Sequence, residues 1–186
     1  MITIREDLLT PNIYSRPGRP ISAHLGLVWH WVANPGTTAK QNRDYFENQR
    51  YQGRYCGAHY IIGLQGEILR CIPDNEIAYH AGATRYKDEA ISALGPHPNN
   101  TTIGIEICHP DASGEFSGPT IAALIDLSAM LCHKYGLPPC VGIWRHYDIT
   151  GKLCPKWYVE DEHAYNAARG AVVAGIEELK KEEYGA

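Results

Sequence analysis

Runs of apolar residues separated by polar turns divide this chain into predicted strands and helices. Several apolar runs have the length of buried strands and are bounded by glycine, proline and asparagine. These predicted strands cover residues 25–32, 58–63, 67–72, 101–108 and 141–144. Only residues 64–66 (LQG) separate the second run from the third, which predicts a β-hairpin.

Helical periodicity fills the stretches between several of these strands. The predicted helices cover residues 39–50, 120–135 and 160–184. In the middle one, Ser117 or Thr120 provides an N-cap and Gly136 provides a stop. Its apolar stripe consists of Ile121, Leu124, Ile125, Met130 and Leu131. A stripe at this spacing is typical of a helix that packs on a core.

Two stretches show neither the apolar runs of the predicted strands nor the spacing of a helix. Residues 1–25 are polar and contain three prolines, which predicts an extended arm with short turns. Residues 83–100 are rich in turn formers and predict a long loop. A loop of that length in a compact domain is usually functional.

The order of predicted elements is strand, helix, hairpin, strand, helix, strand, helix. This order mixes antiparallel pairing with helical crossovers, so we expect an α/β fold with a mixed central β-sheet flanked by helices. The chain has 186 residues, of which 44% are hydrophobic and 20% charged, enough for one domain with a sizeable core. Without a repeat or a linker in the sequence, we expect residues 1–186 to form a single domain.

Charge and cysteine usage narrow the class of protein. The net charge of −4 gives no general attraction to nucleic acid or to an anionic membrane, and no apolar run approaches a membrane span. The N-terminus lacks the pattern of a secretory signal. The six cysteines have irregular spacing and form no CxxC pair, so we expect free thiols and no disulfides. We expect burial for Cys56, Cys71, Cys108, Cys132 and Cys140.

Chemically reactive side chains occur where the predicted strands end. His30 interrupts the first strand, where it requires either a hydrogen-bond partner or a metal. Glu106 lies in an apolar strand, either as a structural ion pair or as a carboxylate poised for proton transfer. His146, Lys152 and Cys154 share the loop after residues 141–144. Two histidines and a cysteine can hold a catalytic zinc, which keeps a fourth position open.

Five stretches together resemble the type-2 N-acetylmuramoyl-L-alanine amidase family, which includes phage endolysins, bacterial autolysins and peptidoglycan recognition proteins. They are residues 28–36 (VWHWVANPG), 58–62 (AHYII), 79–82 (YHAG), 103–108 (IGIEIC) and 145–155 (RHYDITGKLCP). They follow the family's order and cover most of the chain, and the endolysin and prophage autolysin branch is the most similar.

The resemblance implies a role for individual residues. The family's zinc ligands fall on His30, His146 and Cys154. Its catalytic glutamate falls on Glu106 and its lysine on Lys152. The histidine that lines the substrate groove in relatives falls on His80, and Tyr79 occupies a groove position that is often tryptophan.

The resemblance also implies a function and a place of action. We expect Zn²⁺-dependent hydrolysis of the amide between N-acetylmuramate and L-alanine, with peptidoglycan as the partner. We expect synthesis in the bacterial cytoplasm, release by a holin or by lysis, and no cell-wall-binding domain in this chain. Host, peptide-stem preference and oligomeric state are not readable from the sequence.

Three alternatives remain open at this point. A non-catalytic peptidoglycan-binding module could use the same scaffold. A thiol peptidase could use Cys56 or Cys154 as its nucleophile. A structural zinc site would need a fourth protein ligand, which His59, His80 or His109 could supply.

Overall fold

The six strands that the structure describes form one mixed sheet in the order β1-β4-β3-β5-β2-β6. The structure is a computed structural model, and it describes residues 2–184 of the predicted domain. The strands are β1 (Ile4–Glu6), β2 (Gly26–Trp31), β3 (Tyr60–Ile62), β4 (Ile68–Arg70), β5 (Thr102–Ile107) and β6 (Ile143–Arg145). The β3–β4 hairpin is antiparallel, and every other neighbouring pair is parallel. The expected mixed α/β sheet is confirmed.

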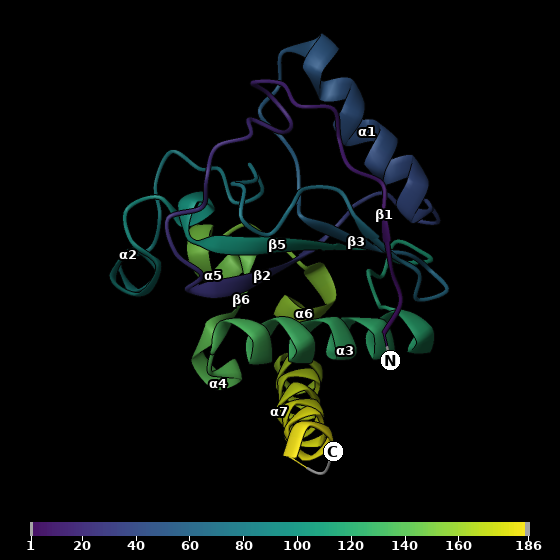
Figure 1. Cartoon of the computed structure of the whole chain (residues 1–186). Helices are drawn as coiled ribbons and strands as arrows, with labels where there is room; N and C mark the ends of the chain where they lie inside the picture. Colours follow the sequence, from purple (N-terminus) through teal and green to yellow (C-terminus); the bar gives the residue numbers. More distant parts are fainter. Residues whose placement is uncertain (1, 185–186) are drawn as a thin grey trace.

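Helices cover both faces of this sheet (Figure 1). They are α1 (Ala39–Gln52), α2 (Asp88–Leu94), α3 (Gly118–Tyr135), α4 (Pro139–Gly142), α5 (His146–Thr150), α6 (Lys156–Glu160) and α7 (Glu162–Tyr184), with a 3₁₀ turn at Pro98–Asn100. Helix α1 lies on one side of the sheet, whereas α3 and then α7 lie on the other (Figure 1). Among the described helices, none combines the length and apolarity required to cross a bilayer.

Alternation along β2 sends successive side chains into different cores. Leu27 and Trp29 pack with the apolar stripes of α3 and α7. Val28 points to the opposite face, where it packs against Leu94 of α2 and Ile149 of α5. His30 has the same parity as Val28, so its side chain belongs to this second face.

Several stretches differ from the expected secondary structure. Of the predicted strand at residues 141–144, residues 141 and 142 belong to α4 and only residues 143 and 144 belong to β6. The N-terminal arm contributes β1, which pairs in parallel with β4. The predicted loop at residues 83–100 contains α2, and the loop after β6 contains α5. Helix α2 has no side-chain N-cap, so its sequence carries no start signal. Burial of Ala90 and Leu94 stabilises it instead.

All six cysteines are free, as expected. Cys71, Cys108, Cys132 and Cys154 are buried, and Cys56 is partly exposed. The expectation of burial is therefore wrong for Cys140, which is exposed in α4, and is met only in part by Cys56.

Candidate metal and catalytic site

Three parallel strands bring the candidate residues to one edge of the sheet. His30 lies near the carboxyl end of β2, directly in register with Glu106 on β5. His146 follows β6, which pairs with the other side of β2, and is the first residue of α5. Because the carboxyl ends of parallel strands meet at the same edge, residues far apart in sequence become neighbours.

The ligand atoms of His30, His146 and Cys154 all lie within 4.8 Å of one another, and all three residues are buried. The Nδ1 atoms of His30 and His146 are 3.1 Å apart. The Cys154 Sγ lies 3.7 Å from the His30 Nδ1. Tetrahedral zinc bonds of about 2.05 Å to nitrogen and about 2.3 Å to sulfur require separations of about 3.3 and about 3.6 Å. These residues therefore fit a zinc ion.

The protonation states of the two histidines also favour a metal. Burial, followed by the nearby His146, holds the pKa of His30 well below its usual value. Burial and then the charge of Lys152 lower the pKa of His146 to about 4. At neutral pH both rings are therefore neutral and offer lone pairs. Burial raises the pKa of the Cys154 thiol to about 12, so a thiolate there requires a nearby cation.

The described residues supply three candidate ligands and no fourth. The three ligands are the only His/Cys/Asp/Glu group in residues 2–184 with this mutual geometry, and His59, His80 and His109 do not join it. His59 already uses both ring nitrogens, one with the Gly104 N–H and one with the Glu76 carbonyl. Three protein ligands fit a catalytic zinc better than a structural one.

Glu106 is half-buried, and its carboxyl forms no ion pair among the described residues. Its Oε2 atom is inaccessible and has no hydrogen-bond partner there. Burial raises the pKa of the Glu106 carboxyl to about 8, although the positive charge of Lys152 acts against this rise. These observations favour proton transfer over the structural ion pair that the sequence left open.

Lys152 is exposed on the segment that follows α5. Its charge lowers the pKa of both His146 and Glu106, so it lies within electrostatic reach of the ligands and of the carboxylate. Lys152 therefore places a positive charge beside a cluster of neutral groups.

Tyr79 and His80 follow one another but face different surroundings. Tyr79 is partly exposed, and its ring packs edge-on against Tyr55 at 5.3 Å. His80 is only 8% exposed, and its Nδ1 lies 3.0 Å from the Nε2 of His30. The His80 Nε2 faces Thr102, a contact that sequence reasoning missed because a threonine at the start of a strand carries no distinguishing pattern.

Comparison with known proteins adds an independent line of evidence. A family model described as N-acetylmuramoyl-L-alanine amidase matches residues 18–157. The chain is 37% identical over 176 residues to a probable N-acetylmuramoyl-L-alanine amidase of Bacillus licheniformis, covering 92% of this chain and 48% of that protein. It is 37% identical over 171 residues to the N-acetylmuramoyl-L-alanine amidase BlyA of Bacillus subtilis (strain 168). This match covers 89% of this chain and 45% of that protein. The chain thus spans about half the length of these curated relatives.

Solved structures show the same fold at lower sequence identity. The catalytic domain of XlyA superposes with a TM-score of 0.71 at 24% identity, covering 92% of this chain and 99% of that one. The structure of PlyL superposes with a TM-score of 0.73 at 20% identity, covering 92% of this chain and 97% of that one.

Proposed function

This chain belongs to the N-acetylmuramoyl-L-alanine amidase family, and from that premise we propose that it is a zinc-dependent hydrolase of peptidoglycan. The bond it cleaves is the amide between N-acetylmuramate and L-alanine. The observation that carries the proposal is the cluster of His30, His146 and Cys154, whose ligand atoms lie within 4.8 Å of one another. The cell wall is then the place of action, and the three side chains hold the zinc.

The residues around the cluster divide the chemistry between them. When bound, zinc supplies a Lewis acid and lowers the pKa of a coordinated water. Glu106 accepts the proton of the attacking water and returns it to the departing amine of L-alanine. A carboxyl with a pKa of about 8 is suited to both transfers at neutral pH. The Lys152 ammonium stabilises the negative charge that develops on the carbonyl oxygen, and Tyr79 offers an aromatic surface to the substrate.

The thiol-peptidase alternative conflicts with the state of both candidate nucleophiles. Burial raises the pKa of Cys56 and of Cys154 to about 12. A nucleophilic cysteine needs the opposite shift, toward a thiolate at neutral pH. Cys154 is more useful as a metal ligand, since a divalent cation stabilises its thiolate.

The proposal is tested by measuring zinc content and the release of L-alanine amino groups from purified cell walls. We expect His30→Ala and Cys154→Ser to lose both zinc and activity. Glu106→Gln should retain zinc and lose most turnover, and Lys152→Ala should lose on the order of 10²–10³ in rate. His163→Ala, Cys140→Ser and Glu89→Gln make the same chemical changes at exposed positions and should behave like the wild type.

Two results would overturn the proposal. One is full activity in His30→Ala or Cys154→Ser. The other is a wild-type protein that binds cell walls and zinc but releases no amine, which would identify a non-catalytic peptidoglycan-binding module.

A further inference from the structure

A line of buried polar groups extends from the metal cluster into the protein. It begins at the His30 ring, whose Nδ1 faces His146 and Cys154 and whose Nε2 lies 3.0 Å from the His80 Nδ1. It continues through the His80 Nε2 to the carbonyl oxygen of Thr102 at 3.3 Å and the hydroxyl of Thr102 at 3.2 Å. We propose that His80 and Thr102 are positioning residues that hold His30 in the tautomer able to bind the metal.

The proton on the His80 ring can be assigned by starting from Thr102, at the far end of this line of polar groups. The Thr102 hydroxyl donates to the Pro98 carbonyl at 2.7 Å. Both Thr102 oxygens can therefore only accept from His80, so the His80 Nε2 carries a proton. A buried neutral imidazole has a single N–H, and the His80 Nδ1 is consequently an acceptor.

The tautomer of His80 in turn determines the tautomer of His30. An acceptor at the His80 Nδ1 requires a donor opposite it, so the proton of His30 lies on Nε2. The His30 Nδ1 then carries a lone pair, and it points at the other two ligands. In the opposite arrangement, the His80 Nε2 lone pair would face the Thr102 carbonyl without a hydrogen bond, which is costly in a buried site.

The backbone around His80 is shaped to hold its ring. A Cβ atom at Gly104 would lie 2.4 Å from the His80 Cγ, so the ring occupies space that any other residue would fill. The Asn99 side-chain oxygen accepts the backbone N–H groups of His80 and Ala81 at 3.2 and 2.8 Å. His80 is thus held from its main chain, its ring face and its far nitrogen.

This arrangement gives His80 a different task from the groove contact that the resemblance implied. A partner on the second nitrogen of a metal-bound histidine fixes the ring and its basicity, and its loss typically weakens metal binding by roughly 10–100-fold. The inference rests on the proposed zinc site, but the tautomer belongs to the metal-free protein and can be measured there.

The first measurement is made on the wild-type protein. Nitrogen-15 NMR of histidine-labelled, zinc-free protein at pH 7 reports which ring nitrogen of His30 is protonated, with His30→Ala assigning the signal. We expect the proton on Nε2. A proton on Nδ1 in a protein that binds zinc and cleaves cell walls would overturn this inference and leave the proposed function intact. A wild type that binds no zinc would instead defeat the proposed function.

The second measurement compares two substitutions at one position. His80→Phe keeps a ring of similar size without an acceptor, and should weaken zinc affinity 10–100-fold in a chelator competition assay. His80→Asn places an amide oxygen where the Nδ1 was, and should stay within about threefold of wild type. His163→Phe is the exposed control.

A substrate-contact role for His80 predicts a different combination of KM and zinc affinity in His80→Phe. Under positioning, His80→Phe saturated with zinc should keep the wild-type KM. An increased KM with unchanged zinc affinity would overturn the proposal and return His80 to the groove. If His80→Phe does not fold, the wild-type tautomer and the His80→Asn variant still decide the question.

Discussion

At the scale of single residues, the candidate site contains groups that destabilise the fold. Glu106 is the clearest case, because its Oε2 is buried without a hydrogen-bond partner among the described residues. A structure selected for stability alone would place an apolar or amide side chain there. An unpartnered carboxyl at this position is consistent with the proposed role of Glu106 in proton transfer.

We predict that Glu106→Gln increases the free energy of unfolding of the zinc-free protein at pH 8. Folding raises the pKa of this carboxyl from 4.5 to about 8, so the folded state binds more protons than the unfolded state between these values. The stability of the wild type therefore falls as the pH rises through that window. The free energy of unfolding of Glu106→Gln should exceed that of the wild type by about 1–3 kcal/mol at pH 8, and the difference should be close to zero at pH 4.

Urea unfolding at both pH values measures this effect, with Glu89→Gln as an exposed control. Equal stability of Glu106→Gln and wild type at pH 8 would show that the Glu106 carboxylate is solvated or paired in the folded protein.

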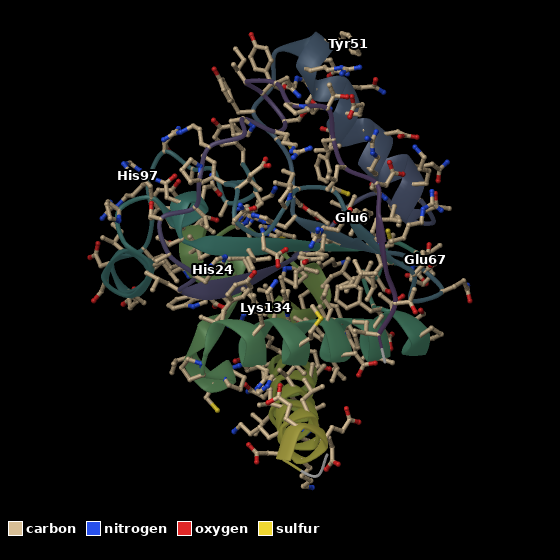
Figure 2. All side chains as sticks on the ribbon, viewed as in Figure 1. Glu6, His24, Tyr51, Glu67, His97 and Lys134 are labelled. Atoms are coloured by element: carbon tan, nitrogen blue, oxygen red, sulfur yellow. The ribbon has the colours of Figure 1, made fainter. Side chains whose placement is uncertain are left out.

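At the scale of elements, α1 shows how a mostly polar helix is held on the sheet. Thr38 caps it, with its hydroxyl accepting the Gln41 N–H while the Gln41 side chain accepts the Thr38 N–H. Arg43 donates to the carbonyl oxygens of Asp7 and Leu8 at 3.1 and 2.6 Å. Tyr51 near its C-terminus is 74% exposed and lies at the tip of the molecule (Figure 2). The Thr38 cap, the hydrogen bonds of Arg43 and the buried side chain of Phe46 hold this helix in place.

We predict that Thr38→Ala lowers the free energy of unfolding by about 1 kcal/mol, because an N-cap side chain satisfies a helix N–H that is otherwise unpaired. Thr38→Ser keeps the hydroxyl and should lose less than half of that. Thr84→Ala, at an exposed loop position, should change little. Chemical denaturation of the three variants provides the measurement, and equal effects of Thr38→Ala and Thr38→Ser would contradict capping by the hydroxyl.

At the scale of the whole molecule, Asp74, in the turn that follows β4, ties the β3–β4 hairpin to helix α3. Its Oδ1 accepts the Tyr60 hydroxyl, and its Oδ2 accepts Lys134 at 2.9 Å and the Tyr135 hydroxyl at 2.7 Å. His24 from the N-terminal arm bonds to the Asp74 carbonyl. Figure 2 shows Lys134 and His24 in the region between the sheet and α3. The side chain and main chain of this one buried residue thus join segments from four parts of the chain.

We predict that Asp74→Asn lowers the free energy of unfolding by about 1–3 kcal/mol at pH 7. Burial acts to raise the pKa of Asp74, but hydrogen bonds from Tyr60, Tyr135 and Lys134 outweigh it and leave the pKa below 3.8. The stabilisation is therefore present above that value and is lost as the pH falls through the folded-state pKa.

Unfolding at pH 7 and pH 2.5 compares the wild type with Asp74→Asn and with Asp126→Asn, an exposed control. The gap between Asp74→Asn and wild type should narrow at the lower pH. A gap that stays constant with pH would rule out the ionised carboxylate as its source.

The sequence by itself determined most of the strands, the long helices and the candidate metal ligands. Apolar runs and helical spacing are local properties, so residues 25–32, 101–108 and 120–135 could be assigned correctly. The motifs around His30 and Cys154 indicated the ligands through their resemblance to a family.

Only the tertiary structure decided what depends on contacts between distant segments. The pairing of β1 with β4, the formation of α2 and the burial of His80 behind His30 all arise from packing that no local pattern encodes. The same reason applies to Glu106, whose missing partner could be recognised only once its surroundings were known. Local chemistry selects the residues, whereas the parallel register of β2 with β5 and β6, and the start of α5 directly after β6, determine which of them meet.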